Sequence, residues 1–375
     1  MAKVLKLWNW NDMVSRLLYF LLLLGTVSLF AQNKGLELLH ADIHVGKKVG
    51  QEQLRIFEGN VHFQQDTIHM WCQRAVMHEQ KKKIDFEDQV KITNEHSTIR
   101  AERIEYYWET RQSYCYHQVQ IKTEENSLYA NYLEYNFKSG QARARDQVYL
   151  FNKENLTHIW GYEGFYNPDE KYSQVSVNAH LMKIDTTSTD TLHIFASVLE
   201  YFNQKEERKA RAIDSVTILQ GNLKAVCDTA IYWIDRDMAI LKHHPQAWYE
   251  DSYLKGLEME VYFDSLRLKQ ITLLGEAEAR TLADSSTGEE DVLKGKRIHF
   301  FIKDKKPERI IAIDNASSLY YITDANAEDK GANYATADTI KIFFQAGKLD
   351  SIGILGGARG TYYPEAFKKE IKVEQ

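Results

Sequence analysis

The sequence predicts an all-β protein built from about ten copies of one module of about 30 residues. Two observations support this fold class. A short pattern of apolar and small residues, with an unusual spacing, recurs along almost the whole chain. Helical periodicity is nearly absent, and the 22 Tyr and 16 Phe against only four Pro favour strands. The prediction is a two-sheet sandwich or an elongated solenoid formed by repetition.

The clearest copy of the pattern is Ile99, Ala101, Ile104 and Tyr106. Alternate residues of a strand share a face, so each pair that is two residues apart lies on one face. The step of three between the pairs breaks this alternation. If all four side chains point into one interior, the strand must bulge or turn a corner at Glu102-Arg103.

The same spacing recurs, and its small residues lie 29 to 42 residues apart. This is the period of a repeat architecture. Clear copies are Leu128-Ala130-Leu133-Tyr135, Ile194-Ala196-Leu199-Tyr201, Leu254-Gly256-Met259-Val261, Leu293-Gly295-Ile298-Phe300 and Ala335-Ala337-Ile340-Ile342. Weaker copies are Leu39-Ala41-His44, Met70-Cys72-Ala75-Met77, Ile159-Gly161-Gly164-Tyr166 and Leu223-Ala225-Asp228-Ala230.

Many copies are followed by a second, alternating strand that begins after a polar turn, as in Asp88-Gln89 before Val90 and Ile92. Alternation of branched apolar and polar residues is typical of a half-buried strand. We therefore expect each module to supply one bent strand and one straight strand. The polar stretch Glu200–Arg211 reads as a turn or hairpin tip.

Charge and motif content exclude several classes of function. The formal net charge of −6 provides no basic footprint for nucleic acid. The chain has no nucleophile elbow, no phosphate-binding loop and no zinc-ligand spacing among its three cysteines, so we expect no enzyme, cofactor or metal site. His243-His244 reads as a surface turn. Asp228 falls on an inward slot, which indicates either a local deformation of the module or a carboxylate facing the interior.

Residues 1–31 read as a signal peptide, because Lys3, Lys6 and Arg16 precede the apolar run Leu17–Ala31. We expect cleavage before Gln32 and export to the periplasm. The competing interpretation is a retained membrane anchor, although the run is shorter than the roughly 20 apolar residues that span a bilayer. The remainder reads as one repeat domain, 32–365, and a charged tail, 366–375.

The inward slots of the modules are the candidate functional residues. They either form a dry core or, with small residues in register, leave a groove that holds acyl chains. In the second case the lipid-binding residues are Ile99, Ala101, Ile104, Tyr106, Val119, Ile121, Leu128, Ala130, Leu133, Tyr135, Val148, Leu150, Ile194, Ala196 and Leu199.

The repeated Ala-Asp or Ala-Glu pairs, at Ala41-Asp42, Ala101-Glu102 and Ala337-Asp338, and the sequence Gly59-Asn60-Val61-His-Phe63 resemble the OstA-like family. The resemblance covers nearly all of residues 36–360. It implies a V-shaped, open β-jellyroll whose interior shields the lipid A chains of lipopolysaccharide. It also implies head-to-tail association and partners in an inner-membrane extractor and the outer-membrane assembly protein.

The chain departs from the family pattern in two respects. Its repeats continue well beyond the length of a minimal bridge protein, and the few residues after Gly357 are too few for the barrel of the outer-membrane assembly protein. The sequence thus predicts a periplasmic lipopolysaccharide-transport protein. Three alternatives stay open: a structural adaptor with the same fold and a dry core that pairs through its edge strands with an outer-membrane barrel, a membrane-anchored member of the same transport chain, and a parallel β-helix that acts on polysaccharide.

Overall fold

The computed structural model describes residues 35–371 except 155, 185–190, 205–206, 222, 250–251, 265–266, 285–286, 304–305, 324–328 and 346–347. The expected signal peptide lies outside these residues. The chain divides into two compact units, unit 1 up to Ala210 and unit 2 from Arg211, a division that the sequence pattern did not indicate.

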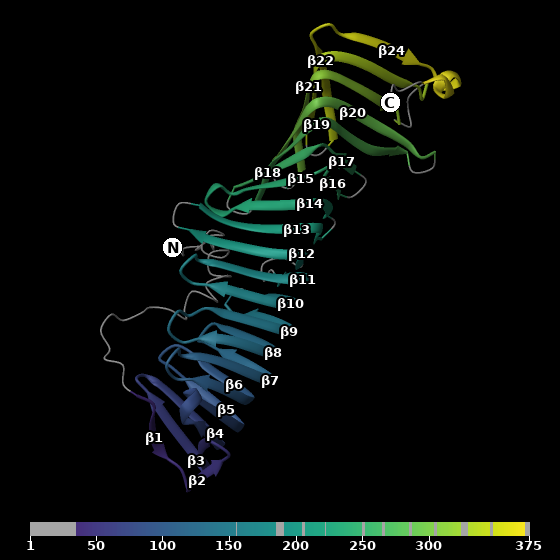
Figure 1. Ribbon diagram of the computed structural model, residues 1–375. Helices are drawn as coiled ribbons and strands as arrows, with labels where there is room; N and C mark the ends of the chain where they lie inside the picture. Colours follow the sequence, from purple (N-terminus) through teal and green to yellow (C-terminus); the bar gives the residue numbers. More distant parts are fainter. Residues whose placement is uncertain are drawn as a thin grey trace, which may run out of the picture. The chain divides into compact units, whose positions relative to one another are not determined.

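Unit 1 consists of strands that follow one another in chain order (Figure 1). They are β1 (Glu37–His40), β2 (Ile43–Val49), β3 (Glu52–Gln65), β4 (Ile68–His78), β5 (Lys83–Thr93), β6 (Thr98–Tyr107), β7 (Gln112–Lys122), β8 (Asn126–Asn136), β9 (Ala142–Asn152), β10 (Thr157–Asn167), β11 (Tyr172–Ile184) and β12 (Thr191–Gln204). A short 3-10 helix, η2 (Glu79–Lys81), joins β4 to β5.

Strand β13 (Glu207–Gln220) runs from unit 1 into unit 2. Unit 2 continues with β14 (Leu223–Trp233), β15 (Met238–Lys242), β16 (Gln246–Tyr249), β17 (Ser252–Lys255), β18 (Glu258–Asp264), β19 (Arg267–Asp284), β20 (Glu289–Lys303), β21 (Lys306–Tyr321), β22 (Ala332–Gln345), β23 (Lys348–Leu355) and β24 (Arg359–Tyr363), and with the 3-10 helices η3 (Ile234–Arg236) and η4 (Glu365–Glu370). The described part of the chain contains no α-helix, and none of its helices is long and apolar enough to cross a membrane.

The strand pairings are antiparallel, as in β5 with β6 and β6 with β7. This rules out the parallel β-helix.

In four places, two short strands are the two halves of a single bent strand. For example, β1 and β2 both pair with β3, and β23 and β24 both pair with β22. The other two such pairs are β15 with β16 and β17 with β18. The 24 described strands are therefore 20 bent strands, which is ten modules of two, as the sequence predicts.

Each module turns its corner at two successive residues with positive φ, such as Asp88 (63°) and Gln89 (56°). Two residues at the corner lie opposite a single residue of the neighbouring strand, since Glu87 pairs with Arg103 and Val90 with Ala101. This is a β-bulge that bends both strands. The ten corners are Gly59-Asn60, Asp88-Gln89, His117-Gln118, Asp146-Gln147, Val177-Asn178, Asp214-Ser215, His243-His244, Gly275-Glu276, Asp314-Asn315 and Gly356-Gly357.

The corners correct one sequence prediction. The polar dipeptides were expected to be turns that precede straight strands, but they lie in the middle of strands, and both strands of a module bend. The physical reason is the backbone conformation: the left-handed region is least costly for Gly and then for Asn, Asp and His, and the corners of this chain are mostly formed by Gly and polar residues. A polar dipeptide therefore marks a corner as readily as it marks a turn between strands.

The acidic residue of the Ala-Asp motif packs onto a corner. The backbone N–H of Asp42 donates to the carbonyl oxygen of Gly59 (3.0 Å), and Asn60 Nδ2 donates to Asp42 Oδ2 (3.0 Å). A Cβ atom on Gly59 would lie 2.3 Å from Asp42 Oδ2. Asp338 has the same relation to Gly356, whose Cβ would lie 2.4 Å from its carboxylate oxygen. The corner thus explains why Gly and Asp occur together at these two sites.

Each bent strand contributes to two arms that meet at the corner. In β6 the half before the corner is Thr98–Ala101, and the half after it is Arg103–Tyr107. Arm A of unit 1 consists of Thr98–Ala101 and the half-strands that pair alongside it; arm B consists of Arg103–Tyr107 and the half-strands that pair alongside it. The edges of the arms far from the corners, where loops join successive strands, are the free edges.

The small residue of each module lies directly beside the corner. A Cβ atom on Gly161 would lie 2.5 Å from Val175 Cγ1 and 3.0 Å from the carbonyl oxygen of Ser176. A Cβ atom on Gly295 would lie 3.1 Å from the carbonyl oxygen of Ile313. The backbone of the neighbouring strand therefore limits side-chain size at this position.

One module is shifted by two residues from its predicted register. In β14, Val226 pairs with Gln246 and Thr229 with Lys242, so the residue beside the corner is Cys227 and not Ala225. The side chain of Asp228 is half exposed and contacts the corner residue His243 (Asp228 Oδ2 to His243 Nδ1, 3.1 Å). The carboxylate of Asp228 therefore does not face the interior. Of the two alternatives for Asp228, a local change in the module is the correct one, and the change is a shift of two residues.

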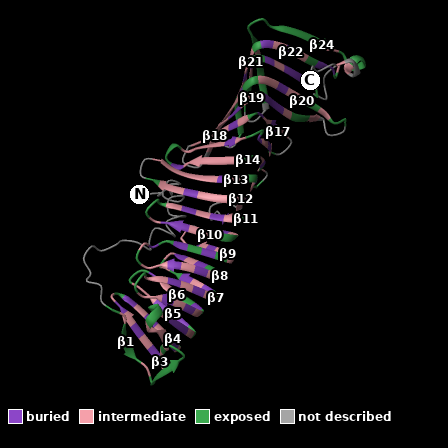
Figure 2. Ribbon diagram, in the orientation of Figure 1, coloured by how far each residue is buried: buried purple, intermediate pink, exposed green. Residues whose placement is uncertain are grey.

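Buried residues recur along β4 to β11 of unit 1 (Figure 2), and the apolar ones among them form one core cluster, which includes Phe86, Ile104 and Leu133. Unit 2 has its own core cluster, which includes Leu273, Ile298 and Ile340.

The prediction for Glu200–Arg211 is wrong in extent: β12 reaches Gln204 and β13 begins at Glu207, so most of this stretch is strand. Its charged residues misled the prediction because they stand on strands whose other face supplies the apolar contacts.

Candidate functional site

The inner faces of the two arms of unit 1 hold the candidate lining residues. Thirteen of the fifteen are buried, among them Ile104 and Leu133, which have no exposed surface. The remaining two, Ile194 and Leu199 of β12, are partly exposed. Twelve of the predicted residues, from Ile99 to Leu150, belong to one hydrophobic core cluster, and Leu199 packs against it.

Sequence reasoning missed one of the four half-strands that each module contributes to this surface. The first halves of the second strands also point inward, and they contribute Ile84, Phe86, Cys115 and Ala144, each with 2% exposure or less. In β5 the inward residues stand at 84, 86, 90 and 92, so the steps are two, four and two around the corner Asp88-Gln89. This spacing is the sequence signal that would have revealed them.

A column of tyrosines is buried where arm B approaches its free edge. Tyr106, Tyr135, Tyr166 and Tyr201 are each at most 2% exposed, and they occupy the same position in four successive modules. Phe137 packs edge-on against Tyr106 and Tyr135, with ring centroids 5.9 and 4.7 Å apart. Sequence analysis identified the first two as lining residues and left out Tyr166 and Tyr201.

Polar side chains replace apolar ones at the free edges. Asn152 Nδ2 donates to Asn126 Oδ1 (2.6 Å) on arm A, and both side chains are buried. On arm B the hydroxyl of Ser113 donates to the carbonyl oxygen of Tyr135 (2.9 Å). The inner surface is therefore apolar near the corners and hydrogen-bonding near the free edges.

The free edges of the two arms meet near the N-terminal end of unit 1. Gln65, which ends β3 on arm A, accepts a hydrogen bond from the hydroxyl of Tyr106 (2.5 Å) and donates from Nε2 to the carbonyl oxygen of Trp108 (3.2 Å). Next to it, Asp66 forms an ion pair with Arg111 of the β6–β7 loop. These contacts join arm A to arm B across the interior.

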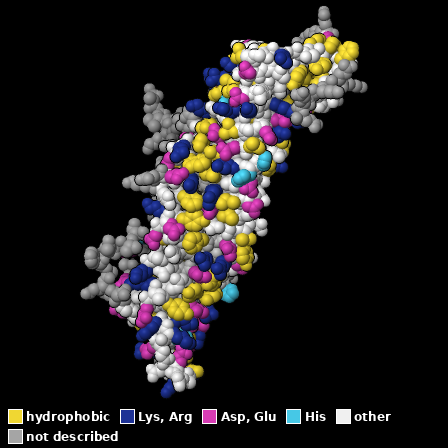
Figure 3. Space-filling view, turned by 45° about the horizontal axis from the view of Figure 1, so that its top comes forward, with side chains coloured by type: hydrophobic (Ala, Val, Ile, Leu, Met, Phe, Trp, Pro, Cys, Tyr) yellow, Lys and Arg dark blue, Asp and Glu magenta, His cyan; other side chains and the backbone are white. Residues whose placement is uncertain are grey.

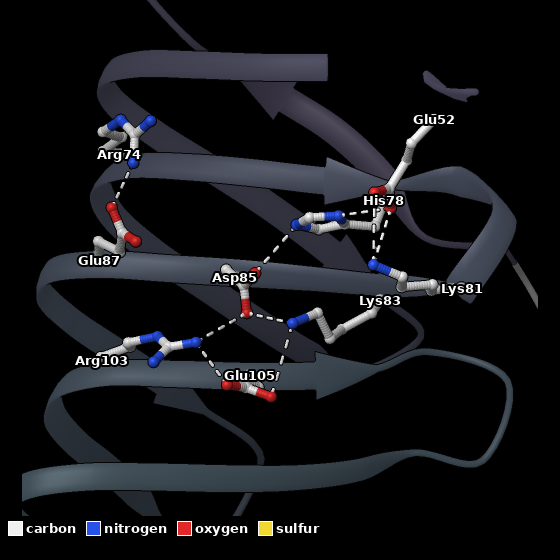
Figure 4. A network of polar contacts seen from close by, with 9 residues as sticks. All are labelled: Glu52, Arg74, His78, Lys81, Lys83, Asp85, Glu87, Arg103 and Glu105. Atoms are coloured by element: carbon white, nitrogen blue, oxygen red, sulfur yellow. Dashed lines mark hydrogen bonds and ion pairs between the residues drawn. The ribbon is translucent and has the colours of Figure 1, made fainter. Parts of the chain in front are cut away.

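The outer face of arm B carries a network of charged residues (Figure 4). The carboxylate of Asp85 is buried and contacts three nitrogen atoms. Its Oδ1 lies 3.0 Å from Lys83 Nζ and 3.6 Å from Arg103 Nη2, and its Oδ2 lies 3.0 Å from His78 Nε2. His78 also contacts Glu52 through Nδ1 (2.8 Å). Basic and acidic groups alternate across the strands, so the network holds neighbouring strands together and leaves no surplus of charge to attract a ligand.

The remaining candidates considered from the sequence are metal ligands and the three cysteines. The residues that the structure covers contain no group of three or more potential ligands placed to bind a metal. Cys72, Cys115 and Cys227 are free thiols, which excludes a Cys72–Cys115 disulfide in this structure. Burial raises the pKa of the Cys115 thiol to about 12, so it stays protonated and unreactive. On the molecular face seen in Figure 3, hydrophobic patches are interspersed with charged side chains of both signs.

Three comparisons place the chain among known proteins. Residues 33–190 match the family model of OstA-like proteins, which agrees with the resemblance seen in the sequence and covers most of unit 1. Curated proteins give no match. One solved structure that is similar to part of the chain is LptH from Pseudomonas aeruginosa, described as the LptA-homologous periplasmic component of the lipopolysaccharide transport device. It is 16% identical, with a TM-score of 0.27, over 30% of this chain and 79% of that chain; at this score the likeness does not establish a common overall fold.

Proposed function

We propose that this chain is a periplasmic lipopolysaccharide-binding transport protein, whose inner faces shield lipid A acyl chains on the way to the outer membrane. The observation that supports it best is the continuous apolar inner surface of unit 1, which lies within the OstA-like region. In this proposal the protein makes and breaks no covalent bond.

The chemistry of the inner surface suits a lipid that has several chains and a polar head. Each buried CH₂ group contributes about 0.8 kcal/mol, so burial against the apolar inner surface favours the binding of acyl chains. Polar residues such as Asn126 and Ser113 stand at the free edges, where a sugar or phosphate head group would leave the interior. No charged pocket is needed for this mode of binding.

Photocrosslinking tests the proposal. A photoreactive residue at Ile104 or Leu133 should capture lipopolysaccharide in cells, because both side chains face the interior of unit 1. The matched control is Arg103, which precedes Ile104 in β6 and is part of the outer charged network (Figure 4). Equal labelling at Arg103 and Ile104 would refute an internal lipid site.

A second candidate is an adaptor with a dry core that acts through its edge strands. Two observations favour it: the inward side chains of unit 1 already fill the interior, and the edge strands expose apolar residues, for example Val45 in β2 and Ile354 in β23. Open edges offer unpaired N–H and C=O groups to another chain. Val61 of β3 is not an edge residue, because it is fully buried and lies between β1 and β4.

Charging the edges tests the adaptor and head-to-tail association. Val45→Lys and Ile354→Lys should each lower oligomer size in sedimentation experiments, because lysine on an edge strand opposes pairing. An oligomer size equal to that of the parent protein in both variants would contradict edge pairing. Partners in the inner and outer membranes, and export itself, belong to the same proposal; a mature mass beginning at Gln32 would support cleavage of residues 1–31.

A further inference from the structure

The contacts that join the two arms at the N-terminal end of unit 1 form a buried polar cluster. Gln65 is 4% exposed and Tyr106 has no exposed surface. Burial raises the pKa of the Tyr106 hydroxyl above its ordinary value, so it remains a hydrogen-bond donor to Gln65 at neutral pH. Asp66 and Arg111 complete the cluster at the rim, with most of both side chains buried.

The cluster connects parts of the sheet that strand pairing does not connect. Gln65 and Asp66 follow the arm A half of β3, whereas Trp108 and Arg111 follow the arm B half of β6. Elsewhere around the interior of this module, backbone ladders and the corners hold the arms together. At the free edges the cluster therefore closes the interior through side chains.

The ion pair of the cluster is not repeated in the next module. The corners nearest the cluster, Gly59-Asn60 and His117-Gln118, each have a counterpart 29 residues later, at Asp88-Gln89 and Asp146-Gln147. In this alignment Asp66 corresponds to Glu95, and Arg111 corresponds to Gly140. The next module thus lacks the cation. A contact that the repeat itself does not require is a candidate for a local role.

We propose that Gln65, Asp66, Tyr106 and Arg111 form a latch that closes the interior of unit 1 and that opens when a lipid acyl chain enters. This inference rests on the proposed function, because it concerns access to the same inner surface. Ile104 and Leu133 have no exposed surface while the latch is closed. A ligand reaches them only when the arms separate, and separation of the arms at this end of unit 1 requires that the contacts between the latch residues break.

A native thiol reports on the opening. Cys115 of β7 is fully buried and lies between Ile104 and Leu133 in the sheet. Replacing Cys72 and Cys227 by Ala leaves Cys115 as the single thiol, and Ala already occupies the position of Cys72 in other modules. The rate at which a maleimide labels Cys115 in the absence of lipid then measures opening of the interior.

Weakening the latch should accelerate labelling. Asp66→Asn and Arg111→Gln should each raise the rate at Cys115 by roughly tenfold, which corresponds to the loss of one net hydrogen bond to a charged group. Exchanging the charges, with Asp66→Arg and Arg111→Asp together, should restore most of the protection. The matched control is Arg103→Gln, which breaks ion pairs to Asp85 and Glu105 on the outer face and should leave the rate unchanged.

Each outcome separates the latch from the lipid site. Unchanged labelling in both single variants, or equal acceleration by Arg103→Gln, overturns the latch even if photocrosslinking at Ile104 captures lipopolysaccharide. Faster labelling in the latch variants, with rescue by the exchanged pair and no acceleration in Arg103→Gln, supports the latch even if no lipid is captured. If the labelling rate rises in step with the fall in urea midpoint across all variants, Arg103→Gln included, the effect is a general loss of stability, and this also overturns the latch.

Discussion

The small residues beside the corners have two explanations that one pair of substitutions separates. Either the backbone of the neighbouring strand leaves no space there, or a small side chain leaves room for a guest lipid. Gly161 and Gly164 stand three residues apart on β10, on the two sides of a corner, and neither has a positive φ. They differ in the space that an added Cβ atom would find.

The expected magnitudes follow from these contacts. A methyl group on Gly161 would lie 2.5 Å from Val175 Cγ1 and 3.0 Å from a carbonyl oxygen, whereas on Gly164 its nearest neighbour would be a valine methyl at 3.3 Å. Overpacking costs about 1–3 kcal/mol. Replacing Gly by Ala without strain stabilises by about 0.4–1 kcal/mol through the unfolded chain. We expect Gly161→Ala to lower the free energy of unfolding by about 1–2 kcal/mol and Gly164→Ala to leave it nearly unchanged.

Urea unfolding followed by tryptophan fluorescence measures the difference, since Trp160 lies beside Gly161 in the chain. With a urea dependence of about 2 kcal/mol per molar, the midpoint of Gly161→Ala should fall by roughly 0.5–1 M. Equal midpoints for the two variants would refute the steric explanation. If Gly161→Ala retained its stability but lost lipid crosslinking at Leu133, the room for a guest lipid would be the better explanation.

Three further predictions test the corners, the core and one buried acid. Val177 is a β-branched residue at φ 63° in a corner, so Val177→Asn should raise stability by about 1 kcal/mol in urea titrations, and a decrease would contradict the role of left-handed backbone there. Leu133→Ala removes a fully buried side chain and should lower the free energy of unfolding by about 2–5 kcal/mol; a loss below about 1 kcal/mol would indicate an interior loose enough to relax around the cavity. Burial raises the pKa of Asp291 to about 6, although the Tyr321 N–H donates to its carboxylate. The folded state therefore binds the proton more tightly than the unfolded state, so unit 2 should lose stability as pH rises from about 4 through 6, and Asp291→Asn should remove this part of a thermal-unfolding pH profile.

The sequence carried much of the fold because the module repeats. The spacing of Ile99, Ala101, Ile104 and Tyr106 located the bent strands, and thirteen of the fifteen predicted lining residues are buried. Repetition makes such a weak pattern reliable, since the same four positions must be filled in each copy. The prediction missed the second set of inward residues around Phe86, because the corner Asp88-Gln89 puts a step of four between the two inward pairs of β5 and its polar residues were read as a turn.

By itself the sequence determined the strand content, the period and the inward-facing side of most strands that carry the four-residue pattern, because these depend on residues close together in the chain. Only the tertiary structure decided that both strands of a module bend, that Cys227 rather than Ala225 stands beside its corner, and that Asp66 meets Arg111. The physical reason is the distance along the chain. Asp66 and Arg111 are separated by three strands, and only the stacking and twist of the intervening strands bring the free edges of the two arms together.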